Sequence, residues 1–211
     1  MRVCDDSYFR LNNFRYNISS DRVSITPEEI RGSIKHLYLT LDMIDKNLVD
    51  NGSQKLSSIV ELANLSSIVG NLLGAGFAAH SNGFYYRNGP HRYPDLVASD
   101  TNFPGIEIKT ALLKNYPKGH QPKPGYYLTY RYQLTDENGN VNGGVLDTVT
   151  IWEVKFGYLS LDDFSCSNTE GDSGKTAVIK SQSLNNMRLL YLDPHIVPYR
   201  HSDNAPYKGF N

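Results

Sequence analysis

The chain has 211 residues, with 22 acidic and 21 basic side chains and a formal net charge of −1. Hydrophobic residues make up 39% of it and charged residues 20%, a composition typical of a globular protein with a sizeable core. No stretch approaches the roughly 20 apolar residues of a membrane span, and the N-terminus lacks an apolar signal core, so we expect a cytoplasmic protein with no membrane contact.

The first part of the chain predicts two helices. Thr26 is a suitable N-cap, Pro27 fits the first helical position, and two acids follow, as at many helix starts. Apolar residues then recur every three or four positions up to a turn at residues 51–52. A second apolar-rich helix begins after Ser53 and is expected to end at the glycines of positions 74 and 76.

The rest of the chain predicts mostly strands, because β-branched and aromatic residues gather in short runs separated by turn residues. The run from Tyr126 to Leu134 alternates, and we expect its tyrosines in the core or on the sheet face rather than as a stacking platform. The expected strands are 83–87, 95–98, 105–111, 126–134 and 148–159, and a short helix is expected at 183–192.

This order of elements, without internal repeats or a linker, predicts one domain of the α/β or α+β class over residues 1–211. Its N-terminal helical part covers about residues 1–76, and its sheet covers about residues 83–160.

Positive charge is concentrated locally. Between Glu107 and Asp136 there is no acidic residue, while four lysines and one arginine occur there. A polyanion could bind such a surface, although a charge run alone is more often a solvated face. The cysteines, Cys4 and Cys166, match no metal spacing and predict reduced thiols, and no pair of His or Cys residues indicates zinc.

One group of residues carries recognisable chemistry. In an extended strand alternate side chains share a face, so Glu107 and Lys109 point one way and their isoleucine neighbours point the other. Asp95 begins the preceding strand and comes alongside Glu107 if the two strands form a hairpin. Two carboxylates suit Mg²⁺, which activates water and neutralises charge at phosphorus, and a nearby lysine can act on that water.

Pro94-Asp95 followed after 11 residues by Glu107-Ile108-Lys109 resembles the signature of the PD-(D/E)xK nuclease superfamily. The phrase from Gly105 to Thr110 is most similar to the catalytic strand of type II restriction endonucleases. The similarity covers roughly residues 55–160 by arrangement and about ten residues by motif.

The resemblance implies a restriction-endonuclease-like core, with a central mixed sheet flanked by helices. It also implies a homodimer that hydrolyses double-stranded DNA with Mg²⁺ to leave 5′-phosphate and 3′-hydroxyl ends. By the resemblance, Asp95, Glu107 and the carbonyl of Ile108 would bind the metal, and Lys109 would act on the attacking water. Glu61, on the upstream helix, is a further candidate for the catalytic site.

The predicted DNA contacts lie in two segments that flank the motif. Lysine mostly positions a protein on phosphates, whereas glutamine and arginine can read base edges. The candidates are Arg87, His91, Arg92, Lys114, Lys118, His120, Gln121 and Lys123. The tail residues Tyr199, Arg200 and His201 could reach DNA or a partner subunit.

The sequence leaves several alternatives open. Glu107 and Lys109 could form a plain surface ion pair, with Asp95 capping a turn. Glu153 and Lys155 repeat the same spacing, and we interpret them as the outer polar face of a later strand. The function could also be that of a DNA-repair nuclease of the same fold, such as a nicking enzyme, a junction resolvase or an exonuclease, or of a non-catalytic DNA-binding module.

Overall fold

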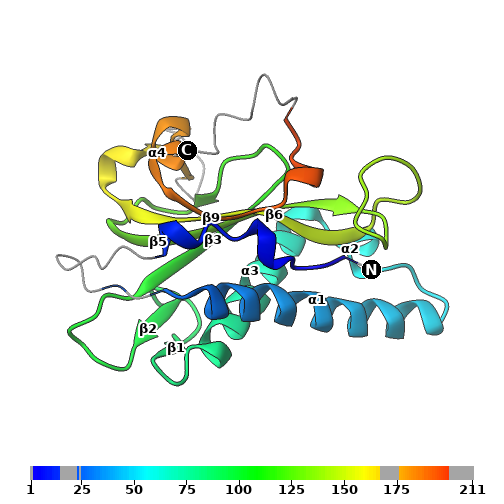
Figure 1. The fold of residues 1–211 in the computed structure, drawn as a ribbon, viewed down its shortest axis with the longest axis horizontal. Coiled ribbons are helices and arrows are strands. Elements are labelled where there is room, and N and C mark those ends of the chain that lie inside the picture. The colour runs from blue at the N-terminus through cyan, green and yellow to red at the C-terminus, as the bar shows by residue number, and fades with distance from the viewer. Residues whose placement is uncertain (1, 15–22, 24, 167–175, 200–211) are drawn as a thin grey trace.

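The computed structural model describes residues 2–14, 23, 25–166 and 176–199. Helices α1 and α3 cover one face of a central sheet, and α4 lies on its other side (Figure 1). Short 3-10 turns occupy Asp6–Tyr8, Leu11–Asn13, Leu161–Asp163 and Pro194–Ile196.

Helix α1 spans Pro27–Asp50 and begins as the sequence predicts. The Thr26 side chain accepts a hydrogen bond from the Glu29 amide, and the Glu29 carboxylate accepts one from the Thr26 amide at 2.7 Å. This reciprocal capping box satisfies two amides that the helix itself leaves unpaired.

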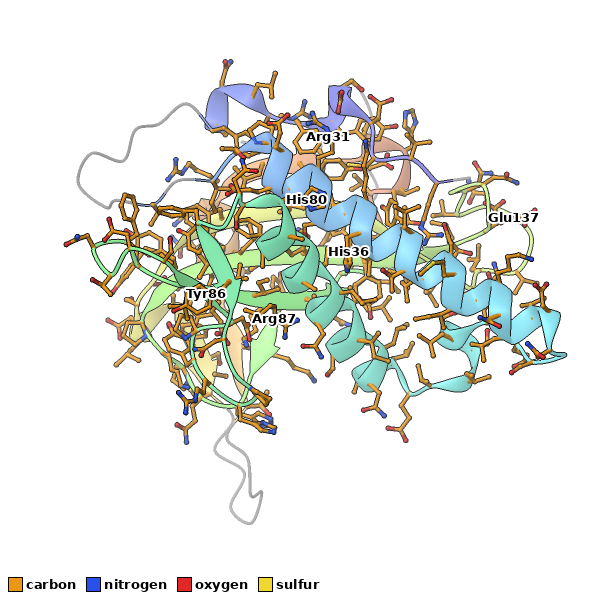
Figure 2. The ribbon with its side chains drawn as sticks, turned by 90° about the horizontal axis from the view of Figure 1, so that it is seen from below. Arg31, His36, His80, Tyr86, Arg87 and Glu137 are labelled. Atoms are coloured by element: carbon orange, nitrogen blue, oxygen red, sulfur yellow. The ribbon has the colours of Figure 1, made fainter. Side chains whose placement is uncertain are left out.

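The second predicted helix differs from the expectation at both ends. A single turn, α2 (Leu56–Ile59), is followed by a separate helix, α3 (Leu62–His80), which runs through both glycines. Gly76 is needed for packing rather than for termination, because a Cβ there would lie 2.9 Å from the Ser33 Cα in α1. Gly76 and Gly32 therefore let α1 and α3 approach closely, and His36 and His80 lie where the helices cross (Figure 2).

By length and composition α3 could cross a membrane, and it is the one such helix among the described residues. It packs instead against α1 and against the sheet, and Leu65, Val69, Leu73 and Phe77 are fully buried. An apolar helix of this kind is typical of the core of a globular domain.

The central sheet is mixed and has the order β1-β2-β3-β5-β6-β9. All its neighbours are antiparallel except β3 and β5, which are parallel. The strands are β1 (Tyr85–Arg87), β2 (Leu96–Ala98), β3 (Ile106–Leu112), β5 (Gly125–Thr135), β6 (Thr148–Leu159) and β9 (Arg188–Leu192). The mixed α/β class and the mixed sheet flanked by helices are thus confirmed.

A small antiparallel sheet has the order β4-β8-β7, from β4 (Lys118–Gly119), β8 (Ala177–Ile179) and β7 (Phe164–Cys166). Helix α4 spans only Ser181–Asn186, so the prediction of one helix over residues 183–192 is wrong for its second half. That half is strand β9, which pairs with β6 and is apolar because it is buried there. Both cysteines are free, as expected.

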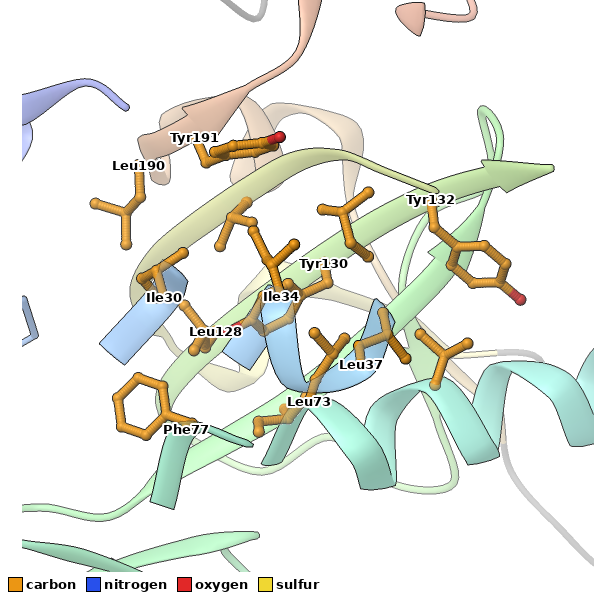
Figure 3. Packing of buried hydrophobic residues seen from close by; sticks show 14 of the residues in the cluster. Ile30, Ile34, Leu37, Leu73, Phe77, Leu128, Tyr130, Tyr132, Leu190 and Tyr191 are labelled. Carbon is orange, nitrogen blue, oxygen red and sulfur yellow. The ribbon is translucent and has the colours of Figure 1, made fainter. Parts of the chain in front are cut away.

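The main core lies between the two long helices and the sheet (Figure 3). Ile30, Ile34 and Leu37 of α1 pack there with Leu73 and Phe77 of α3. Tyr130 and Tyr132 of β5 are fully buried in the same cluster, which confirms that these tyrosines are core residues.

Candidate active site

Asp95 lies at the end of the β1–β2 connection, directly before β2. Strands β2 and β3 form the predicted antiparallel hairpin, in which Leu96 pairs with Ile106. Gly105 makes this close approach possible, since a Cβ there would lie 2.6 Å from the Leu96 carbonyl oxygen. Asp95 is therefore held next to the first residues of β3.

Glu107 and Lys109 share one face of β3, as the alternation predicts. Ile106 and Ile108 point into the helix-covered core and are 0% and 6% exposed. The Lys109 Nζ donates to the Glu107 Oε1 at 2.5 Å, and the two side chains are 24% and 12% exposed. This is a recessed ion pair, so the alternative of a plain surface pair does not describe it.

Two backbone hydrogen bonds join Asp95 to this pair. The Asp95 amide donates to the Glu107 Oε2 at 3.2 Å, and the Ile108 amide donates to the Asp95 Oδ2 at 2.9 Å. In an extended strand the N–H and C=O of one residue point toward the same edge. The Ile108 carbonyl therefore faces the edge at which the Asp95 carboxylate lies.

Burial raises the pKa of Glu107; the Lys109 ammonium lowers it in part, and the Asp95 carboxylate raises it further. Burial and the nearby Asp95 carboxylate thus disfavour ionisation of Glu107, and a cation relieves that cost. The site therefore favours the binding of a further positive charge in addition to that of Lys109.

The donor set fits a hard divalent cation. Carboxylate and carbonyl oxygens are the ligands that Mg²⁺ prefers, and it commonly uses one or two carboxylates with water and phosphate. Within the described ranges, no group of three or more His, Cys, Asp or Glu side chains is placed to hold a metal. A softer metal such as Zn²⁺ would lack its usual nitrogen and sulfur ligands here.

The segment between β3 and β5 crosses the face that bears Glu107 and Lys109. Because these strands are parallel, residues 113–124 must return the chain to the start of β5. Gly119 of β4 lies against Lys109, where a Cβ would be 3.1 Å from its Cε. This crossover, which we call the basic loop, carries exposed side chains of Lys114, Lys118, His120, Gln121 and Lys123.

The other predicted DNA contacts differ in their location and in their partners. His91 and Arg92 are exposed in the turn just before Tyr93 and Asp95. Arg87 points to the helix side of the sheet (Figure 2), where its guanidinium donates to the Asn71 carbonyl at 2.6 Å. Lys114 lies over the Tyr199 ring at 5.4 Å, while Arg200 and His201 fall outside the described residues.

Glu61 does not join Asp95 and Glu107. It is the exposed N-cap residue of α3, whose Gly74 lies against Ile108, and among the described residues no third acid joins the two carboxylates. Thirteen residues of helix separate the two positions, about 20 Å at a rise of ~1.5 Å per residue. Helix α3 also packs on the Ile108 face of β3, opposite the face that bears Glu107 and Lys109, which the local sequence does not reveal.

The interpretation of Glu153 and Lys155 as an outer polar face is wrong. Both side chains are fully buried, because β6 is covered on both sides. Glu153 accepts two hydrogen bonds from Arg131, at 2.7 and 2.5 Å, and the Lys155 Nζ donates to the Leu184 carbonyl at 3.2 Å. This repeat of the motif spacing is a buried structural network rather than a second site.

Sequence reasoning missed two tyrosines beside the carboxylates. Tyr127 is the register partner of Glu107 on β5, and Tyr93 directly precedes the Pro94-Asp95 motif. The negative charge of Glu107 adds to burial in raising the pKa of Tyr93. Proximity to the motif could have suggested Tyr93, whereas Tyr127 follows only from the strand register.

Comparisons with protein-family models and with curated proteins find no match to this chain.

Proposed function

We propose that the protein is a Mg²⁺-dependent endodeoxyribonuclease of the PD-(D/E)xK type, acting on double-stranded DNA as a type II restriction endonuclease. One observation carries the proposal: Asp95, Glu107 and Lys109 converge on one edge and face of the β2–β3 hairpin, linked by hydrogen bonds. A structural ion pair needs one acid and one base, whereas this cluster contains a second carboxylate.

Each residue has a definite role in this proposal. Asp95, Glu107 and the Ile108 carbonyl would hold Mg²⁺, which when bound lowers the pKa of water and neutralises charge on the phosphate. Lys109 donates to Glu107, so its Nζ lies within reach of a water molecule beside that carboxylate. It would align this water for in-line attack on phosphorus and stabilise the added negative charge, leaving 5′-phosphate and 3′-hydroxyl ends.

The basic loop supports DNA as the substrate. The net charge of −1 gives no general attraction for a polyanion, so the positive charge must act locally. The loop crosses the face of the sheet that bears Glu107 and Lys109, and its lysines are exposed. A homodimer facing a palindromic site, and a cytoplasmic location, are parts of the same proposal.

The test is digestion of plasmid and phage DNA with Mg²⁺, followed by sequencing of the ends. We expect discrete fragments, whereas nicks or progressive loss of ends would indicate a repair nuclease. Asp95→Ala and Lys109→Ala should abolish cleavage while DNA binding persists. Asp100→Asn, which changes an exposed acid in the β2–β3 turn, is the matched control and should remain active.

Full cleavage by either alanine variant would exclude this site. No Mg²⁺-dependent cleavage across a broad panel of DNA substrates would instead favour a non-catalytic DNA-binding module.

A further inference from the structure

Two tyrosine hydroxyls hold the end of the basic loop. The Tyr93 hydroxyl donates to the Pro124 carbonyl at 2.9 Å, and the Tyr127 hydroxyl donates to the Lys123 carbonyl at 2.8 Å. Tyr93 comes from the β1–β2 connection and Tyr127 from β5, so two separate elements bind consecutive carbonyls of the loop. Such paired contacts restrict the backbone of Lys123 strongly.

The residues around Tyr93 leave space for its phenol ring and hydroxyl. A Cβ at position 125 would lie 2.2 Å from the Tyr93 hydroxyl oxygen, so only glycine leaves room for it there. Lys123 lies between Pro122 and Pro124, whose rings fix their own backbone angles. The loop end is therefore stiff before any ligand binds, and stiffness lowers the entropic cost of binding.

The Lys123 side chain is directed by the same tyrosine. Its Nζ lies 4.6 Å from the centroid of the Tyr93 ring, in cation–π contact, while the side chain remains exposed. Tyr93 is two residues before Asp95, and Tyr127, which binds the Lys123 carbonyl, is the register partner of Glu107. An accessible lysine is thus held by two tyrosines that adjoin the carboxylates along the chain or across the sheet.

We infer that Tyr93 is a positioning residue, which together with Tyr127 fixes Lys123 to bind a backbone phosphate of DNA next to the phosphodiester that is cut. This inference rests on the proposed nuclease function and adds a specific contact to it. Lysine acts on phosphate as a point charge without reading sequence, so the contact serves affinity and register.

The test is steady-state cleavage by Tyr93→Phe, which loses the hydroxyl and keeps the ring. We expect KM to rise about three- to tenfold, as for one lost hydrogen bond, with kcat within about twofold. Lys123→Met should also raise KM. It should reduce the slope of log binding constant against log salt concentration by the amount expected for about one phosphate contact. Tyr93→Phe added to Lys123→Met should raise KM no further.

Tyr116→Phe is the matched control, since Tyr116 is an exposed tyrosine of the same loop, and its kinetics should stay unchanged. A readout without DNA is tryptic cleavage after Lys118, which should be faster in Tyr93→Phe than in the control. If Tyr93→Phe changes neither KM nor the rate of tryptic cleavage, the inference about Tyr93 is overturned. The proposed nuclease function would still stand in that case, provided that the wild type cleaves DNA. A wild type that cleaves no DNA would overturn the proposed nuclease function and the role of Lys123. Tryptic cleavage would still report whether the Tyr93 hydroxyl holds the end of the basic loop.

Discussion

Asp95 accepts a hydrogen bond at 2.9 Å from the backbone amide of Ile108, the residue between Glu107 and Lys109. This bond joins the two halves of the sequence motif through the backbone of β3. The Asp95 carboxylate is thereby held toward the edge that the Ile108 carbonyl also faces. The hairpin, rather than any one side chain, brings the acids together.

Glu107→Gln should separate stability from activity. The folded chain raises the pKa of Glu107, so its ionisation opposes folding as pH rises through that pKa, and the cost is absent below about pH 4.5. Glutamine keeps the shape without the charge. We expect a higher midpoint of urea unfolding at pH 7, no gain at pH 4, and a loss of cleavage of at least ~100-fold. An unfolding midpoint at pH 7 equal to or below that of the wild type would contradict this view of the site.

Lys155→Met should stabilise the protein at neutral pH. Burial lowers the pKa of Lys155, so the unfolded chain binds more protons than the folded one between that lowered pKa and 10.5. Methionine has a similar size and removes the cost of burying the ammonium, which falls on the folded chain alone. We expect the gain, measured by urea unfolding, to shrink as pH rises from 7 to 9.5. A gain that does not depend on pH would show that titration of Lys155 is not its source.

Arg131→Met should destabilise the chain by ~3–5 kcal/mol, because it leaves the fully buried Glu153 without its partner. Changing both residues to methionine should restore much of the loss. Lys46→Met breaks an exposed helix pair with Asp50 and should change the free energy of unfolding little. Equal effects of Arg131→Met and Lys46→Met would disprove the burial of the Arg131–Glu153 pair.

Two glycines of α3 should respond in opposite directions to alanine. Gly76→Ala places a Cβ 2.9 Å from the Ser33 Cα, so we expect a loss of ~1–3 kcal/mol from forced separation of the helices. At Gly70 the nearest atom, in Thr110, is 3.5 Å away, so Gly70→Ala should gain up to ~1 kcal/mol of helix propensity. Thermal unfolding of both variants tests the α1–α3 contact, and stabilisation by both would refute it.

The sequence by itself determined the features that depend on near neighbours. The capping box at Thr26 joins two residues three positions apart, and the placement of Glu107 and Lys109 on one face follows from the period of a strand. The β2–β3 hairpin that brings Asp95 to them spans only a short turn. These features were predictable because the residues involved lie close along the chain.

Only the tertiary structure decided which charges lie in a site and which lie in the core. Glu153 and Lys155 have the same spacing as Glu107 and Lys109, but β6 lies inside the sheet and is covered on both faces. The path of α3 likewise excluded Glu61, and the register of β5 brought Tyr127 to the carboxylates. Strand order and helix packing arise from contacts between distant segments, and the spacing of residues along one strand does not encode them.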